Sequence, residues 1–246
     1  MKSIILCEGS TDSILLQYFM RKVYGWQDNK SNERANSKFL KQIRTLTKEN
    51  NKLSIAGCGG SGRILPGLSY ILEYNSLSSE SEAYDKIVIL TDRDEVITET
   101  EFAQEIEKVL HQKNMEFNDN PVNNHWIECT YKNGHGKNCK FSLLMLVIPF
   151  EETGAMETFL LNVISENDEY DAEIIRKCNS FVDNVDSEKR YLSKRRNITK
   201  AKFDVYFSVR TAAEQFAERQ NILKNVEWEK YAALQADFRK LGELSN

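Results

Sequence analysis

Two groups of acidic residues each follow a short, mostly apolar segment, and their carboxylates have the clearest chemical potential in the chain. The first group follows segment 2–7 (KSIILC) and the second follows segment 86–91 (KIVILT). Together they supply five carboxylates: Glu8, Asp12, Asp92, Asp94 and Glu95. Carboxylates held close together repel each other unless a cation joins them, and hard oxygen ligands suit Mg²⁺ or Mn²⁺. The pattern therefore predicts a divalent-metal site if the two groups meet in the fold.

Both acidic groups sit between a predicted strand and a predicted helix. A short β-branched segment, polar residues and then helical spacing indicate strand, loop and helix, with helices expected at 13–24 and 99–112. In one parallel sheet the two strand ends share the carboxyl edge, where open α/β sheets bind ligands. Asp92 and Asp94 alternate along an extended segment, so both are expected to point to one side and ligate one ion. Asp12 or Thr11 is expected to cap the first helix.

Composition limits the classes of protein that this chain can belong to. With 246 residues and a hydrophobic fraction of 41%, it can bury a sizeable core. Its longest apolar segment, 141–150, is too short to span a bilayer, and residues 1–8 do not form a signal peptide. Five widely spaced cysteines indicate free thiols, which predicts a cytoplasmic protein without a membrane segment.

The remaining elements predict an α/β fold. Further strands are expected at 52–56, 126–131 and 139–148, the last two as a hairpin around Asn133-Gly134. Further helices are expected at 36–50, 63–74, 156–165, 170–182, 199–207, 211–223 and 228–241. We therefore expect a parallel sheet flanked by helices, with a β-hairpin extension and a helical C-terminal region. The boundary is predicted near residue 165, giving a catalytic domain 1–165 and a helical region 166–246.

A glycine-rich segment, Gly57–Gly62, lies between a predicted strand and a predicted helix. It follows the second strand of the chain, and neither an acid about 20 residues on nor a Gly-Lys-Ser/Thr sequence follows it, which makes a dinucleotide or triphosphate loop the weaker interpretation. One alternative is a tight turn that needs positive φ. The other is a backbone cradle for a substrate phosphate, formed by Gly59, Gly60, Ser61, Gly62 and Arg63.

A basic segment, 189–202, carries seven Lys and Arg residues in fourteen positions. The net charge of −4 gives the whole chain no attraction to nucleic acid, so a polyanion partner needs a local basic patch of this kind. Tyr191 and Phe203 lie in or beside it and could stack on bases. The alternative is an ordinary solvated helix face. The candidate nucleic-acid contacts are Lys194, Arg195, Arg196, Lys200 and Lys202.

The acidic segments resemble the Toprim domain, a catalytic module of topoisomerases, bacterial primases, OLD-family nucleases and small ribosomal-RNA maturases. That family has an apolar strand ending in Glu-Gly and a later one ending in Asp-x-Asp, as Glu8-Gly9 and Asp92-Arg93-Asp94 do here, with a glycine-bearing strand end between them. The Glu-x-x-x-Asp form of Glu8 and Asp12 looks closest to OLD-like nucleases and stand-alone Toprim-like proteins. The resemblance covers about residues 1–115.

This resemblance implies roles for the acidic residues. Asp92 and Asp94 would bind Mg²⁺ or Mn²⁺, Glu95 or Asp12 would complete the ligand set, and Glu8 would bridge to a second ion or act as general base. Glu95 departs from the family pattern, in which this position is often Gly. Glu157 is a further acidic candidate, although a first-turn helix acid is the simpler interpretation. The functional lysine of OLD-like nucleases corresponds to Lys200 or Lys202.

The implied function is a Mg²⁺-dependent phosphodiester-processing enzyme, a nuclease acting on DNA or RNA in DNA repair or phage defence. A separate ATPase is a possible partner, by analogy with the motor fused in OLD proteins. The main alternative is a non-catalytic module that binds nucleic acid or a partner. A third is a nucleotide-binding α/β protein that uses the glycine loop without a divalent metal.

Overall fold

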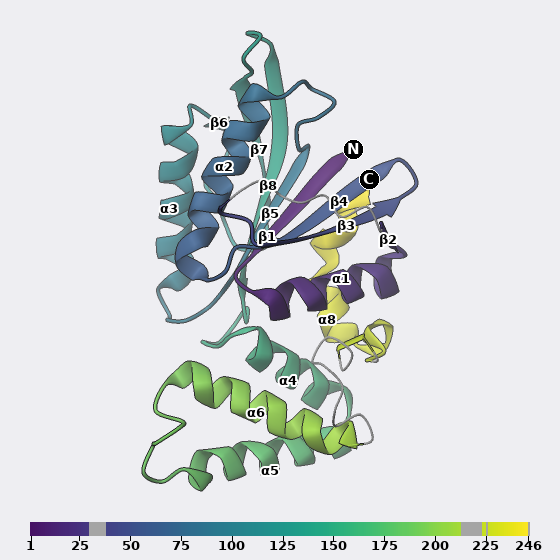
Figure 1. Cartoon of the computed structure of the whole chain (residues 1–246), viewed down its shortest axis with the longest axis vertical. Helices are drawn as coiled ribbons and strands as arrows, with labels where there is room; N and C mark the ends of the chain where they lie inside the picture. The colour runs from purple at the N-terminus through teal and green to yellow at the C-terminus, as the bar shows by residue number, and fades with distance from the viewer. Residues whose placement is uncertain (30–37, 213–222, 225, 246) are drawn as a thin grey trace.

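The protein is an α/β fold built on one eight-stranded sheet (Figure 1). The structure is a computed structural model and describes residues 1–29, 38–212, 223–224 and 226–245. The strand order is β2-β3-β4-β1-β5-β8-β7-β6. The four central strands are parallel: β4 (Asn51–Gly57), β1 (Lys2–Cys7), β5 (Lys86–Asp92) and β8 (Asn138–Ile148). Antiparallel strands complete each side: β3 (Gln42–Lys48), β2 (Gln27–Asp28), β7 (Trp126–Lys132) and β6 (Glu116–Phe117).

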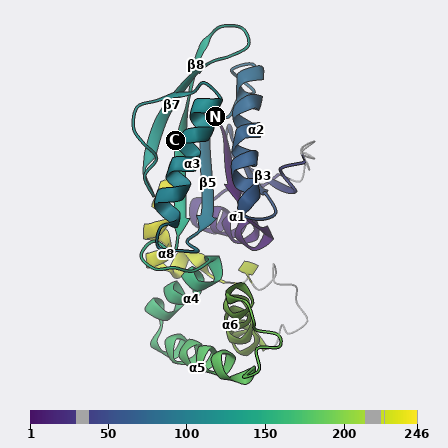
Figure 2. The same ribbon diagram turned by 90° about the vertical axis from the view of Figure 1, so that its left-hand side faces the viewer.

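The central strands are apolar on both faces because helices cover both faces. Along β1, Ile5 and Cys7 join one buried cluster, while Ile4 and Leu6 join the other. The first face is covered by α1 (Ser10–Tyr24), and the second by α2 (Ile64–Leu77) and α3 (Thr98–Gln112) (Figure 2). Strands β1 and β5 pair in parallel, so their carboxyl ends lie side by side at one edge of the sheet.

A lobe of three helices lies beyond the carboxyl edge of the central strands (Figure 1). It contains α4 (Met156–Asn167), α5 (Glu169–Val185) and α6 (Arg195–Arg210). Residues of these helices, among them Phe159 and Phe203, belong to the same buried cluster as β1 and α1. The lobe is therefore packed against the edge at which the acidic residues lie.

The C-terminal segment returns to the sheet beside α1. It is made of η3 (Trp228–Lys230), α8 (Ala232–Asp237) and η4 (Arg239–Ser245). Its buried side chains Trp228, Leu234, Phe238, Leu241 and Leu244 pack in the cluster that holds Ile5 of β1. The buried cluster therefore joins residues on both sides of the predicted boundary near 165, and that boundary stays a prediction.

The prediction of a helix at 36–50 is wrong in the part that the structure describes. Residues 42–48 form β3, which pairs antiparallel with β4 from Gln42↔Gly57 to Lys48↔Asn51. Glu49, with φ of 53°, and Asn50 make the turn between the strands. Pairing with a buried neighbour overrides the helical spacing here, and residues 30–37 of the expected loop and helix lie outside the described residues.

Two other elements differ from their expected form. The expected hairpin is confirmed as β7 and β8, but β8 is also the fourth parallel strand of the central sheet. The helix expected at 228–241 is broken into η3, α8 and the start of η4, and most of the one expected at 211–223 lies outside the described residues. In the described part of the chain, no helix has the length and apolar character needed to cross a membrane.

Candidate functional site

Glu8 lies against the end of β5, so the two acidic strand ends meet as the sequence predicts. Its Oε1 accepts hydrogen bonds from the Thr91 hydroxyl at 2.7 Å and from the Asp92 backbone N–H at 3.1 Å. The parallel pairing of β1 with β5 brings these groups together. Two donors fix one carboxylate oxygen of Glu8, while Oε2 has no hydrogen-bond donor among the described residues. The carboxylate is therefore held in place with one oxygen available.

Asp12 lies in the first turn of α1 and is buried. Gly9 is the N-cap residue of the helix, not Asp12 or Thr11 as expected, and its backbone N–H donates to Asp12 Oδ2 at 2.8 Å. The helix begins earlier than the apolar spacing indicates because Ser10 and Thr11 already take helical geometry. Asp12 thus stabilises the turn that follows Glu8 and carries a buried charge beside it.

Asp92 connects the sheet to the helical lobe. Its Oδ1 accepts a hydrogen bond from the backbone N–H of Met156, the first residue of α4, at 3.0 Å. A carboxylate at a helix N-terminus is stabilised by the unpaired amides and the helix dipole. The next residue, Glu157, is buried, with 5% of its surface exposed. A fourth acidic side chain therefore reaches this region from α4. On the sequence alone, a site role for Glu157 is the less favoured interpretation.

The buried carboxylates disfavour each other's charge. Burial, followed by the negative charges of Asp12, Glu8 and Glu157, raises the pKa of Asp92 to about 9. Burial also raises the pKa of Asp12 to about 6, with Glu8 and Glu157 adding to the rise. The pKa of Glu8 is raised by burial against the opposing hydrogen bonds from Thr91 and Asp92. The four residues therefore form one electrostatically coupled acidic cluster: Glu8, Asp12, Asp92 and Glu157.

The side chains of this acidic cluster are of the type that binds a hard divalent cation, but they do not lie close enough together to surround one. Its carboxylate oxygens are the ligands that Mg²⁺ and Mn²⁺ prefer, and their mutual repulsion would be relieved by positive charge. In the ranges that the structure describes, no three His, Cys, Asp or Glu side chains already converge closely enough to hold an ion. Binding would therefore draw these carboxylates closer together.

Asp94 and Glu95 lie at the rim of the site and not in the acidic cluster. Their side chains are 67% and 75% exposed, and each lies 3.8 Å from the guanidinium of Arg195. The strand ends at Asp92, so the alternation that would turn Asp92 and Asp94 to one side does not continue. Arg195 also donates to the backbone carbonyl of Asp94. The negative charge of Asp94 nevertheless reaches Glu8, where it favours a higher pKa.

Arg93, between the two aspartates, has a structural role that the sequence did not reveal. Its Nε donates to the Pro149 carbonyl at 2.7 Å, and its Nη2 donates to the Phe150 carbonyl at 2.8 Å and to Glu99 at 2.6 Å. The guanidinium thus joins the end of β5 to the segment that enters α4. An arginine with five donors in a fixed fork suits this task, and no sequence motif marks it.

Arg93→Met is therefore expected to destabilise the protein by about 2–4 kcal/mol, because the buried Pro149 carbonyl and the partly buried Phe150 carbonyl lose their donor. Urea unfolding curves would measure the loss. Arg176→Met is the matched control, since Arg176 is exposed on α5 and pairs only with nearby Glu173. It should change stability by less than about 0.5 kcal/mol. Equal effects of the two substitutions would contradict the joining role of Arg93.

The glycine loop holds the end of β1. The backbone N–H groups of Gly59 and Gly60 both donate to the carbonyl of Glu8 at 2.8 Å, and their φ angles are 86° and 127°. The tight-turn interpretation is thus confirmed, and these two amides are already occupied. Ser61, Gly62 and Arg63 are exposed in the short 3₁₀ turn before α2, and phosphate binding by them stays a prediction.

Some basic residues at the start of α6 and along it act on the acidic cluster, whereas others pair within the helical lobe or are exposed. The positive charge of Arg196 opposes the rise in the pKa of Glu8, and that of Lys200 opposes the rise at Asp12. These two lie four residues apart on one face of α6, which faces the acidic cluster. Lys202 instead pairs with Asp183 of α5 at 2.9 Å, and Lys194 is exposed. Lys200 is therefore better placed than Lys202 to act at the site.

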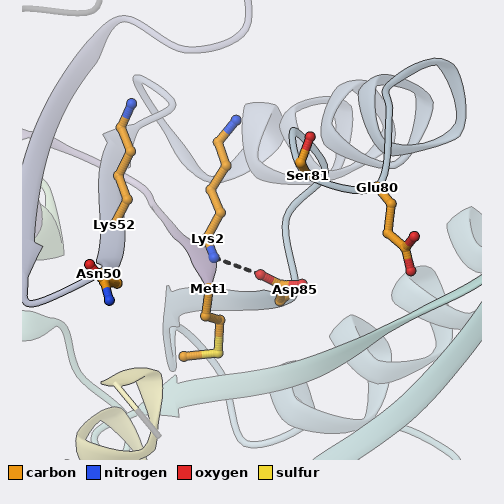
Figure 3. A pocket seen from close by; sticks show the side chains of 7 residues that line it. All are labelled: Met1, Lys2, Asn50, Lys52, Glu80, Ser81 and Asp85. Carbon is orange, nitrogen blue, oxygen red and sulfur yellow. Dashed lines mark hydrogen bonds between the residues drawn. The ribbon is translucent and has the colours of Figure 1, made fainter.

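A separate pocket of about 580 Å³ lies at the amino ends of the strands, on the edge opposite the acidic cluster. Figure 3 shows its lining residues, Met1, Lys2, Asn50, Lys52, Glu80, Ser81 and Asp85. The Lys2 backbone N–H donates to Asp85 at 2.6 Å, and the Lys2 ammonium donates to the Glu82 carbonyl at 2.7 Å. None of the residues predicted to do chemistry lines this pocket.

The fold is shared with a solved structure of low sequence identity. A hypothetical protein from Pyrococcus horikoshii OT3, PH0156, is 14% identical, with a TM-score of 0.53 over 100% of this chain and 99% of that chain. A glyoxalase/bleomycin resistance protein/dioxygenase family enzyme from Burkholderia phytofirmans PsJN is 10% identical over 58% of this chain and 96% of that chain, and its TM-score of 0.19 carries no argument. No curated protein matches the sequence. The family model described as a protein of unknown function (DUF3226) matches residues 2–240, so the chain belongs to this family.

Proposed function

We propose that this protein is a Mg²⁺- or Mn²⁺-dependent phosphodiester-processing enzyme, a nuclease acting on nucleic acid. The observation that carries the proposal is the buried acidic cluster at the carboxyl edge of the sheet, where burial and the neighbouring carboxylates raise the pKa of Asp92 and of Asp12. Perturbed carboxylates at a strand edge are typical of functional sites in α/β proteins. The resemblance of the acidic segments to Toprim domains supports the same reaction class.

The carboxylates of the acidic cluster would bind the ion, and hydrogen bonds from the backbone and from Thr91 would hold those carboxylates in position. Asp92 and Glu8 offer one free oxygen each, Asp12 and Glu157 lie beside them, and Asp94 and Glu95 stand at the rim. Bound there, the ion supplies Lewis-acid polarisation of a phosphoryl oxygen and of the attacking water. When Oε2 of Glu8 is not bound to the ion, this oxygen would instead accept a proton from the attacking nucleophile, a role that the raised pKa of Glu8 suits.

Positive side chains of α6 would receive the substrate. Arg196 and Lys200 act electrostatically on Glu8 and Asp12, so a phosphate between α6 and the sheet would meet both cations. Arg195, which now contacts Asp94 and Glu95, lies at the entrance. Phosphate neutralisation by these residues explains how a chain with a net charge of −4 can bind a polyanion.

Cleavage assays with plasmid DNA and with RNA would test the proposal. Wild-type protein should cleave at least one of them with Mg²⁺ or Mn²⁺ and should lose all cleavage in EDTA, because the carboxylates alone do not polarise the phosphate. Binding of nucleic acid without cleavage under every metal condition would instead support the non-catalytic nucleic-acid module.

Two further proposals concern the location and the partner of the protein. The cysteines are free among the described residues, which fits a cytoplasmic protein. A separate ATPase partner is proposed by analogy only.

A further inference from the structure

The loop between α5 and α6 is built to hold one tyrosine. Asp186 accepts hydrogen bonds from the backbone N–H groups of Arg190 at 3.1 Å and of Tyr191 and Leu192 at 2.7 Å each. The Asn197 side chain donates to the Tyr191 carbonyl at 3.2 Å. Both backbone polar groups of Tyr191 are therefore held, one by each neighbouring helix end, which fixes the backbone position from which its side chain extends.

This fixed tyrosine exposes its ring to solvent. Tyr191 is 69% exposed, although its backbone is held at both polar groups. The guanidinium of Arg190 lies 5.4 Å from the ring centroid. Lys189, Arg190 and Lys194, which surround it in the sequence, are all exposed. An exposed aromatic face within a patch of positive charge is complementary to a base attached to a phosphate backbone.

The loop that carries Tyr191 lies next to a helix end that contacts the acidic loop of the candidate site, which is the segment 93–95 that follows β5. Arg195, four residues after Tyr191, donates to the backbone carbonyls of Asp94 and Arg93, the latter at 3.4 Å. Four residues span at most about 14 Å, so the backbone of Tyr191 lies within that distance of Arg195, whose side chain contacts the rim of the acidic cluster. Val96 and Ile97, which follow the acidic loop, are also exposed. The entrance therefore presents apolar surface as well as charge, which phosphate binding alone does not need.

We propose that Tyr191 is a stacking platform for an unpaired base beside the acidic cluster, so that the substrate is single-stranded nucleic acid or an unpaired segment of a longer molecule. This inference rests on the proposed function and narrows its substrate class. An aromatic ring can stack only on a base whose face is free, and inside a duplex both faces are covered by neighbouring bases. Stacking on one aromatic side chain contributes about 1–3 kcal/mol for each base.

Fluorescence anisotropy with a labelled single-stranded oligonucleotide and its duplex, both in EDTA, would test the inference without cleavage. Wild-type protein should bind the single strand more tightly than the duplex. Tyr191→Ala should weaken single-strand binding by about 5- to 150-fold and leave duplex binding within twofold, because it removes the stacking energy only. Tyr191→Phe, which keeps the ring face, should bind the single strand within about twofold of wild type.

Tyr170→Ala is the matched control, since Tyr170 is equally exposed, at 76%, but lies at the start of α5. It should leave single-strand binding unchanged. Unchanged binding by Tyr191→Ala, or equal losses with Tyr170→Ala, would overturn the inference, even if wild-type protein cleaves nucleic acid with Mg²⁺. The converse result, Tyr191-dependent binding without any cleavage, would overturn the nuclease proposal alone. A Tyr191 that instead mediates self-association would leave both oligonucleotide affinities unchanged.

Discussion

Glu8→Gln and Asp92→Asn are each expected to abolish Mg²⁺-dependent cleavage, with a loss greater than about 100-fold. Loss of a group that only supports a metal ligand costs about 10- to 100-fold, so loss of a ligand or of the general base should cost more. Both substitutions keep the shape of the side chain. In Asp92→Asn the amide oxygen can still accept from the Met156 N–H, so the contact between β5 and α4 remains.

Initial cleavage rates at several Mg²⁺ concentrations would measure this loss. Asp119→Asn, an exposed carboxylate outside the acidic cluster, is the control and should keep wild-type activity. Melting curves should show that both inactive variants are folded. Full activity in either variant would remove that residue from the proposed site, and full activity in both would end the nuclease assignment to this edge of the sheet.

Asp92→Asn is also expected to stabilise the metal-free protein, in opposition to its effect on activity. Burial and the neighbouring carboxylates raise the pKa of Asp92 to about 9 in the folded protein, against an ordinary value of 3.8. The folded state therefore binds more protons than the unfolded state between these values, and stability falls as the pH rises from about 4 to about 9. Asparagine cannot ionise, so the variant avoids this loss.

Thermal melts in EDTA at pH 4 and pH 8 would reveal the effect. The variant and wild type should melt at similar temperatures at pH 4, and the variant should melt several degrees higher at pH 8, since about 1 kcal/mol corresponds to 2–4 °C in a chain of this size. Mg²⁺ should stabilise wild type and act much less on the variant. A variant that melts below wild type at pH 8 without metal would contradict the repulsion within the acidic cluster.

Local patterns predicted the centre of this molecule well. The strands that end at Cys7 and Asp92 and the helix after Asp92 are where the sequence places them, because apolar alternation and turn residues agree there with the tertiary fold. The meeting of Glu8 with the end of β5 follows from parallel pairing and could be predicted without coordinates. The segment 42–48 could not, because its helical spacing is compatible with a strand that finds a partner.

The long-range parts of the site lay beyond sequence reasoning. Burial of Glu157 depends on how α4 approaches the sheet, and the position of Arg196 and Lys200 depends on how α6 packs on α4. Asp94 looked like a partner of Asp92, but the strand ends one residue too early to keep their side chains aligned. The position of Glu157 in the first turn of a helix that follows a strand made it a candidate, but only the structure shows that it is buried.

The return of the C-terminal segment to the sheet has a consequence for how the protein is made. Phe238, Leu241 and Leu244 fill the face of the sheet that carries Ile5, and the Ser245 carbonyl accepts a hydrogen bond from Asn51 at 3.1 Å. Strand β1 is synthesised long before these residues, so the buried cluster that contains Ile5 is complete only after the C-terminal segment has been made. Until then α1 covers only part of this apolar face, so we expect residues 1–165 to be less stable alone than together with the segment that follows them.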